Sequence, residues 1–257
     1  MSQADTGAPQ PEEESGKMSF LEHLDELRRR LVHIVAYLFL GFIVCWFFSR
    51  PIYNFLAAPI TRFLPKGTKL AYTNPTDPFI IYMKVAFLAS VFLTLPLNLY
   101  EVWKFIAPGL YRKEKKYVLP FLFSSVILFV LGGAFCYYTI LPACFQWLLG
   151  LGSSFMPVIK IDEYLDLTNM MLLGFGIIFE MPVIAAFLSM FGLISAGFLW
   201  RKFKYSIVII VTLAAIISPT GDAFNLMVWS APMILLYFVS IAVAAVFGHR
   251  RKAKRSA

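Results

Sequence analysis

The sequence has little charge and few of the residues that build catalytic or metal centres. Charged residues make up 15% of its 257 residues, whereas a soluble domain has about a quarter. There are three histidines and three cysteines, and no C-x-x-C pair occurs. The cysteines are therefore interpreted as small apolar residues, and neither a metal nor a cofactor is expected. An intramembrane enzyme needs a nucleophile with a base or a metal, so the chain is not expected to be an enzyme.

Apolar residues in long runs dominate the sequence instead. Hydrophobic residues reach 59% and the mean hydropathy is +0.72. Because a soluble fold of this length could not bury so much apolar surface, lipid is the expected solvent. The fifth run holds only about 15 residues, or about 22 Å of helix, against a bilayer core of about 30 Å. Six transmembrane helices are predicted, at 31–48, 78–100, 117–141, 167–191, 204–218 and 224–247.

Lysine and arginine are distributed unevenly over the connections between these runs. One side, which includes both termini, carries 17 of the 23 basic residues, the other side carries five, and Lys84 lies inside the second run. The basic side is expected to face the cytoplasm, which places the N-terminus and the C-terminus there. The same pattern explains the net charge of +8 without nucleic acid, which is not expected as a partner.

The chain divides simply into tails and one membrane domain. Residues 1–17 are polar and predict a disordered cytoplasmic tail, residues 18–248 form the six-helix domain, and residues 249–257 form a basic cytoplasmic tail. The outer connections 49–77 and 142–166 contain prolines and aromatic residues, which favour ordered caps.

A short amphipathic helix is predicted at the start of the membrane domain. Ser19 and Glu22 fit a capping box. One apolar stripe follows at helical spacing: Phe20, Leu24, Leu27 and Leu31. We expect this helix to lie on the membrane surface and to lead into the first span.

Carboxylates gather in the segments assigned to the cytoplasmic face. Glu26 lies at the membrane entry, and Glu101 and Glu114 flank a loop that mixes aromatic residues with a Pro-Gly turn. Such a rim can bind a peptide that carries arginines, because guanidinium and carboxylate pair through two hydrogen bonds. The alternative is internal: Glu26 pairs with Arg30 at i,i+4, and Glu114 is solvated. The charge pattern alone favours this alternative.

A few ionisable groups lie inside or at the ends of the spans. Glu180 is near the middle of the fourth run, where an ionised carboxylate costs several kcal/mol, so it is either paired or protonated and is a candidate for function. Lys84 can snorkel outward. Asp222 can cap the sixth helix. A secondary transporter or channel built around Glu180 and Lys84 is the alternative function. Pro182 permits a broken helix at Glu180, but no internal repeat supports this alternative.

Five strings together resemble the TatC family of the twin-arginine protein translocase, and the resemblance covers residues 18 to 248. The strings are SFLEHLDELRRRL (19–31), NPTDPF (74–79), YEVWKFIAPGLYRKEKK (100–116), FGIIFEMPV (175–183) and SPTGDAF (218–224). The resemblance implies an all-α, cup-like bundle of six transmembrane helices in a prokaryotic inner membrane. It also implies a protein that binds the twin-arginine signal peptides of folded precursors. By resemblance, export would be driven by the proton-motive force, with single-span partners of the TatA and TatB type, in a homo-oligomeric receptor complex.

The resemblance also assigns roles to individual residues. Glu26 and Glu114 match the signal-binding carboxylates, and Arg28 and Phe105 match positions linked to the same site. Glu101 is a further candidate, where some members carry glutamine.

Three more residues match functional positions away from that site. Glu180 matches an intramembrane acid linked to contact with TatA. Pro59 and Asp222 match outer positions tied to activity after binding.

Overall fold

The computed structural model describes residues 20–64, 70–106, 118–152, 154–155, 158–218 and 222–255. Within these ranges the regular structure is helical, apart from one isolated bridge between Ala71 and Lys160. The all-α prediction is confirmed. The predicted N-terminal tail, Ser19 and Glu114 lie outside the described residues.

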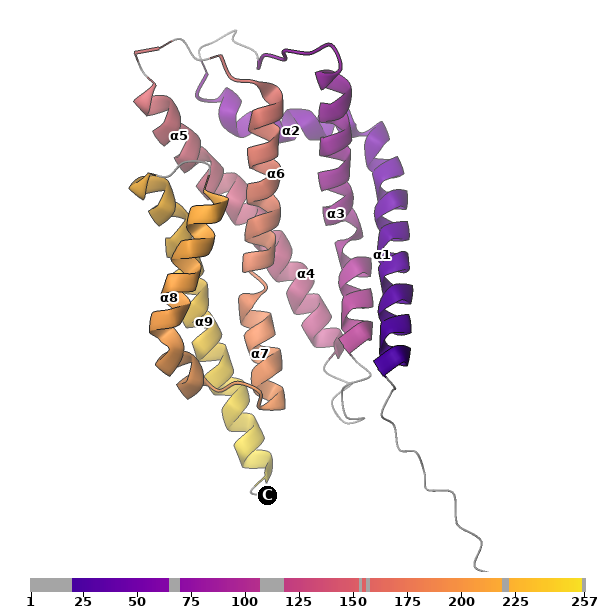
Figure 1. The fold of residues 1–257 in the computed structure, drawn as a ribbon, viewed down its shortest axis with the longest axis vertical. Coiled ribbons are helices and arrows are strands. Elements are labelled where there is room, and N and C mark those ends of the chain that lie inside the picture. The colour runs from indigo at the N-terminus through magenta and orange to yellow at the C-terminus, as the bar shows by residue number, and fades with distance from the viewer. Residues whose placement is uncertain are drawn as a thin grey trace, which may run out of the picture.

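The helices run between two ends of the molecule (Figure 1). We name the end where α1 begins and α9 ends the terminal end, and the opposite end, where α2 crosses, the cap end. The chain passes between them in six steps: α1, α3, α4 to α5, α6 to α7, α8 and α9. The elements are α1 Phe20–Phe47, α2 Ser49–Thr61, α3 Asp77–Ile106, α4 Val118–Phe135, the π-helix η3 Cys136–Ile140, α5 Leu141–Leu151, α6 Ile161–Ile178, α7 Met181–Phe191, α8 Ala196–Ile217 and α9 Ala223–Arg255.

Five described helical stretches are long and apolar enough to cross a membrane. They correspond to α1, α3, α4 to α5, α6 to α7, and α9. The remaining pass, α8, has 22 residues, but basic residues (Arg201, Lys202 and Lys204) occupy its first turns. The short fifth apolar run is thus part of a longer helix, and the predicted start at 204 was wrong. The helix begins at Ala196, because the Ser195 hydroxyl caps it by accepting a hydrogen bond from the Phe198 amide at 3.1 Å.

The separate surface helix predicted before the first span was also wrong. No break separates the two segments, and α1 runs as one helix of 28 residues. Between the first and second spans, the helix α2 lies across the cap end, as expected of an ordered cap (Figure 1).

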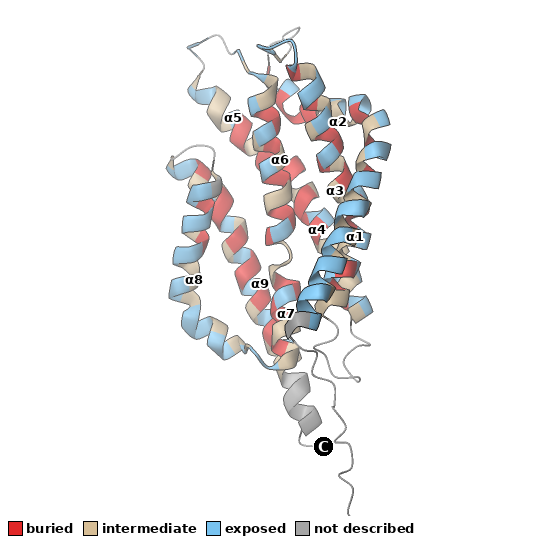
Figure 2. Ribbon diagram, turned by 45° about the vertical axis from the view of Figure 1, so that its right-hand side comes forward, coloured by how far each residue is buried: buried red, intermediate tan, exposed pale blue. Residues whose placement is uncertain are grey.

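The helices differ in how far their residues are buried (Figure 2). The core is lined by α6, whose Leu165, Met171 and Phe175 are fully buried. In contrast, α1 packs mainly on α3 and exposes Leu31, Val35 and other large apolar residues on its remaining surface. Lipid is the solvent that such a surface requires.

Candidate functional site: a carboxylate recess at the terminal end

The first turns of α1 form a polar recess of about 300 Å³ at the terminal end. Three carboxylates and two guanidinium groups line it: Glu22, Asp25, Glu26, Arg29 and Arg30. These residue types lie on one face because they recur at i, i+3 or i+4 along the helix. Acidic groups therefore outnumber basic groups among the lining side chains.

Arg30 links the recess to the neighbouring helix α3. Its Nη1 donates to Oε2 of Glu101 at 2.9 Å, and its Nη2 donates to Oε1 of Glu26 at 3.0 Å. The Tyr37 hydroxyl and His33 Nδ1 lie 3.5 Å and 3.7 Å from the same Glu101 carboxylate. Glu101 is only 3% exposed, so its charge is compensated inside the interface between α1 and α3. The internal pair of Glu26 with Arg30, the alternative considered above, is therefore present.

Glu26 keeps one oxygen available. Its Oε1 accepts from Arg30, whereas its Oε2 is buried and has no hydrogen-bond partner among the described residues. A buried carboxylate oxygen without a donor costs free energy, and a second cationic donor entering the recess would satisfy it.

The other residues predicted for this site are placed differently. The Phe105 ring stacks on His23 of α1, with centroids 4.4 Å apart, and so lies beside the same first turns. Arg28 is exposed and does not line the recess. Glu114 lies outside the described residues. The structure thus brings Glu26, Glu101 and Phe105 to one region, and it adds Arg30, which the motif comparison had not singled out.

Glu180 lies at a break in the fourth pass. The helix stops at Ile178 and resumes at Met181, because Pro182 has no amide hydrogen to bond to the Ile178 carbonyl. Oε1 of Glu180 is buried without a hydrogen-bond partner in the described structure, whereas the Ser125 hydroxyl of α4 hydrogen-bonds to the carboxyl group as a whole. The broken helix allowed by the sequence is therefore confirmed.

Lys84 is held in an ion pair and does not simply extend toward the membrane surface. Its partner is not Glu180. Its Nζ lies 2.5 Å from Oδ1 of Asp166 on α6. This ion pair joins α3 to α6 near the cap end. Sequence reasoning missed Asp166, although an intramembrane lysine signals that a partner must exist. The pair also removes Lys84 from the alternative transporter site around Glu180.

Pro59 shapes the packing of α2 on the bundle. Proline lacks the amide hydrogen that would bond to the Phe55 carbonyl, and the Tyr137 hydroxyl donates to that carbonyl at 2.6 Å. The Tyr164 hydroxyl donates to the next carbonyl, that of Leu56, also at 2.6 Å. Two tyrosines from η3 and α6 thus fix the flat helix to the cap end.

Asp222 and Asp77 organise turns at the same end. Asp222 caps α9, since its Oδ1 accepts from the Asn225 amide at 2.9 Å. Asp77 accepts from the amides of Thr73 and Asn74 at 2.9 Å and 2.8 Å, which closes the turn before α3.

Lys160 extends this polar cap. Its ammonium lies 3.1 Å from Glu163, and this hydrogen bond raises the pKa of Lys160, with smaller contributions from Asp162 and Asp77. Within the described residues no cluster of three or more His, Cys, Asp or Glu side chains is placed to hold a metal ion.

Comparison with known proteins identifies the family. Residues 22–232 match the family model described as Sec-independent protein translocase protein (TatC). The chain is 49% identical to the TatC protein of Koribacter versatilis over 241 residues, which cover 93% of this chain and 89% of the relative. It is 39% identical to the TatC protein of Desulforapulum autotrophicum, with 93% and 88% covered.

Solved structures agree with the sequence comparison. A crystal structure of the twin-arginine translocase receptor TatC superposes with a TM-score of 0.78 at 34% identity, covering 88% of this chain and 99% of that one. A second TatC crystal structure, in the detergent DDM, gives the same TM-score at 33% identity and covers 87% and 99% of the two chains. The chain therefore belongs to the TatC family: it is a transport subunit of the Sec-independent translocase, not an enzyme, and a multi-pass protein of the bacterial inner membrane.

Proposed function

We propose that this chain binds twin-arginine signal peptides of folded proteins in the carboxylate recess, with the terminal end facing the cytoplasm. The observation that carries the proposal is the unpartnered Oε2 of Glu26, buried in a recess where acids outnumber bases. Residues 1–17 and 249–257 would then be cytoplasmic tails of the domain 18–248.

An incoming arginine suits this recess better than a lysine. Its planar fork can donate to two carboxylate oxygens at once, and charge-assisted hydrogen bonds are about twice as strong as neutral ones. Arg30 already donates to Oε1 of Glu26 and is fixed by its second hydrogen bond, to Glu101. Oε2 of Glu26 is therefore left to accept from a second guanidinium, that of the peptide. Glu101 therefore serves to position Arg30 rather than to meet the peptide directly.

Glu114 would supply the second acceptor, and Phe105 the apolar surface beside it. Glu114 follows the end of α3 at Ile106 by eight residues in the sequence, and its part in the site rests on the family resemblance. Arg28, exposed on α1, would act at the rim and not within the recess.

The test is binding of a twin-arginine peptide to the protein in nanodiscs. Glu26→Lys and Glu114→Lys should each weaken binding by about 2–5 kcal/mol, because one arginine loses its acceptor and meets a like charge. Glu163→Lys, the same change at the cap end, is the matched control and should leave affinity unchanged. A peptide with two lysines should bind poorly to the wild type. Unchanged affinity in both well-folded recess variants would return these acids to the role of helix-surface ion pairs.

We further propose that a single-span TatB-type partner packs against α8. The apolar run of about 15 residues in this pass leaves about 8 Å of the bilayer core unmatched, which a partner helix and a thinned bilayer would accommodate. Ala214 is fully buried inside the bundle and cannot contribute to that contact. Ala215 remains exposed, together with Val208, Ile209 and Ile216.

Disulfide scanning along 207–217 tests this surface. Cysteines at the exposed positions 208, 209 and 216 should crosslink to the partner, whereas those at the buried positions 210 and 214 should not. Absence of any crosslink to a single-span protein would refute the docking proposal.

Later steps would involve the remaining matched residues. Glu180 would contact a TatA-type helix after signal binding, and Pro59 and Asp222 would hold the cap end in the shape that transport requires. Transport would be driven by the proton-motive force in a homo-oligomeric receptor complex. These assignments rest on the family resemblance together with the burial of Glu180 and the cap contacts.

A further inference from the structure

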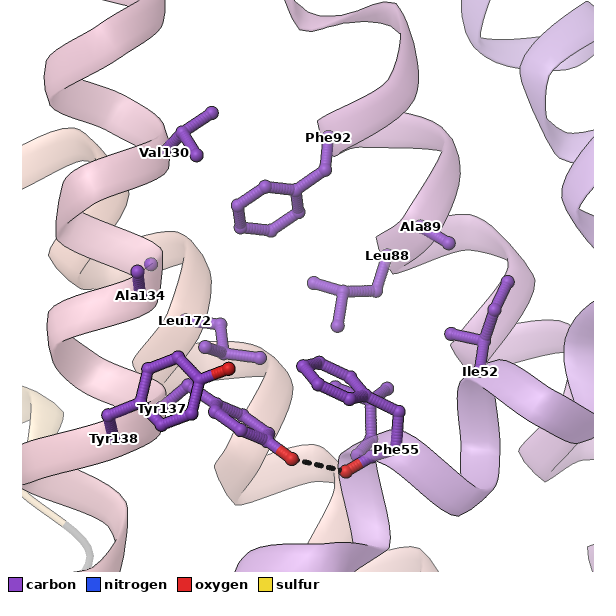
Figure 3. Close-up of a pocket in the computed structure, with 12 residues that line it drawn as sticks. Ile52, Phe55, Leu88, Ala89, Phe92, Val130, Ala134, Tyr137, Tyr138 and Leu172 are labelled. Atoms are coloured by element: carbon purple, nitrogen blue, oxygen red, sulfur yellow. Dashed lines mark hydrogen bonds between the residues drawn. The ribbon is translucent and has the colours of Figure 1, made fainter.

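A cavity of about 400 Å³ lies beneath α2. Its walls come from α2, α3, α4 and η3, and Leu172 of α6 forms part of its wall (Figure 3). It is lined by Ile52, Phe55, Leu56, Leu88, Ala89, Phe92, Val130, Gly133, Ala134, Tyr137, Tyr138 and Leu172. Nothing in the proposed signal-binding site uses this space.

The mouth of the cavity faces the apolar surface of the bundle. Val130 and Phe55 on its rim are 46% and 53% exposed, and Ile127 and Leu131 beside Val130 are exposed as well. These residues lie on membrane-spanning α4 and on α2, so the opening faces lipid and not a polar solvent.

Small residues keep the cavity open. A Cβ atom at Gly133 would approach the Phe92 ring to 2.8 Å, so the absence of a side chain at this position allows the ring to pack against α4. Ala89 of α3 and Ala134 of α4 both line the space, on opposite sides of it (Figure 3). Only two lining side chains carry a polar group: the Tyr137 hydroxyl, which already donates to the Phe55 carbonyl, and the Tyr138 hydroxyl, so the lining offers water few partners.

An apolar space of this size needs an apolar occupant. A cavity of about 150 Å³ stays dry and binds benzene, and this one is more than twice as large. Protein interiors tolerate few voids of such size. The abundant apolar molecule at a lipid-facing mouth is an acyl chain, and each buried methylene adds to its retention.

We propose that this cavity binds one acyl chain of a bilayer phospholipid, whose phosphate is held by Arg62. Along α2, Ile52, Phe55, Pro59 and Arg62 follow at spacings of three and four residues, so Arg62 lies on the same face as Ile52 and Phe55, which line the cavity. Arg62 is exposed and forms the C-cap of α2, less than two turns past Leu56, the last residue of this helix in the cavity lining. A phosphate anion there complements the guanidinium.

The experiment uses the full chain in nanodiscs that contain phosphatidylglycerol with a diazirine near the end of one acyl chain. After irradiation, lipid adducts should concentrate on the segments 52–56 and 130–138. Ala134→Leu fills the space and should lower this labelling about tenfold, as two lost methylenes would predict. Ala89→Leu, from the opposite wall, should do the same, so a folding defect in one variant leaves the second informative. Arg62→Gln should lower it about fivefold.

Ala36→Leu is the matched control, because Ala36 is an exposed alanine on α1 outside the cavity; its labelling should equal that of the wild type. Equal labelling in Ala134→Leu and Ala36→Leu, or labelling spread evenly along α4, would overturn the proposal. Loss of wild-type labelling on adding a twin-arginine peptide would also overturn it, since a peptide would then be the occupant. The inference is independent of the signal-binding recess, which the peptide-binding measurement tests separately.

Discussion

Lys84 on α3 and Asp166 on α6 form an ion pair 82 residues apart in sequence, with Nζ and Oδ1 separated by 2.5 Å. The two side chains are 32% and 59% exposed, so they remain partly open to their surroundings. In a membrane-spanning bundle, such a pair joins two passes that otherwise meet along a limited surface.

Breaking this pair should destabilise the bundle. Asp166→Asn leaves the Lys84 ammonium without its counter-charge, and we expect a loss of about 1–3 kcal/mol, between the values for exposed and buried pairs. The double variant Lys84→Met, Asp166→Leu should recover most of this loss. Thermal unfolding in nanodiscs measures both. Glu163→Gln, which breaks the exposed Lys160 pair within one helix, is the control and should barely shift the melting temperature. Equal shifts of the melting temperature for Asp166→Asn and Glu163→Gln would show that the α3–α6 ion pair stabilises the bundle no more than the exposed pair does.

Glu101 and Arg30 should be coupled energetically. Glu101→Gln leaves Arg30 with Glu26 alone, which should cost about 2–4 kcal/mol of stability because the site is nearly sealed from solvent. Twin-arginine peptide affinity should fall as well, since Arg30 then competes for Oε2 of Glu26. A double-mutant cycle with Arg30→Gln measures the coupling. Tyr37→Phe removes only the long 3.5 Å contact and should have little effect. Additive losses in the cycle would contradict the arrangement.

The hydroxyl of Tyr137 should matter only because of Pro59. Tyr137→Phe removes the donor to the Phe55 carbonyl and should cost about 1–2 kcal/mol. In a Pro59→Ala background the helix regains its own amide donor, so the same change should cost much less. Tyr138→Phe, on the neighbouring exposed ring, is the control. An identical cost in both backgrounds would mean that the proline plays no part.

Glu180 should be dispensable for folding and needed for export. Glu180→Gln keeps shape and hydrogen-bonding capacity, and Glu180→Ala removes a costly buried acid, so both should fold. Export of a twin-arginine precursor should fall in Glu180→Ala, while signal-peptide affinity stays near that of the wild type. Normal export by Glu180→Ala would mark the acid as a tolerated core group.

The proposed orientation can be tested with single cysteines in a cysteine-free background. Those at 10, 110, 198 and 254 should be protected from an impermeant thiol reagent in intact cells, whereas those at 66 and 158 should react. Phe198 and Val158 are both exposed, at 44% and 73%, so burial does not explain a difference between these two. Reaction at 110 from outside would reverse the topology.

The spans were predictable because an apolar run of about 20 residues has few structures open to it other than a membrane-spanning helix. Pro182 indicated the break at Glu180, because proline cannot donate the helical hydrogen bond. The start of α8 was misplaced, since basic residues in a helix's first turns look like a loop in a hydropathy pattern. The partners of Lys84 and Glu101 could not be read from sequence, because Asp166 and Arg30 lie 82 and 71 residues away. Local spacing offered Glu26 as the partner of Arg30, and the fold added the second acid.

The break at Glu180 divides the fourth pass into two helical segments, α6 and α7. The half nearer the cap end, α6, packs chiefly on α4, whereas the half nearer the terminal end, α7, packs chiefly on α9. With the Ile178 carbonyl freed by Pro182, the joint between them is the part of the pass that bends at least cost. We therefore expect a displacement of α7 at the terminal end to bend the pass at Glu180, whose Oε1 is buried, before it moves α6.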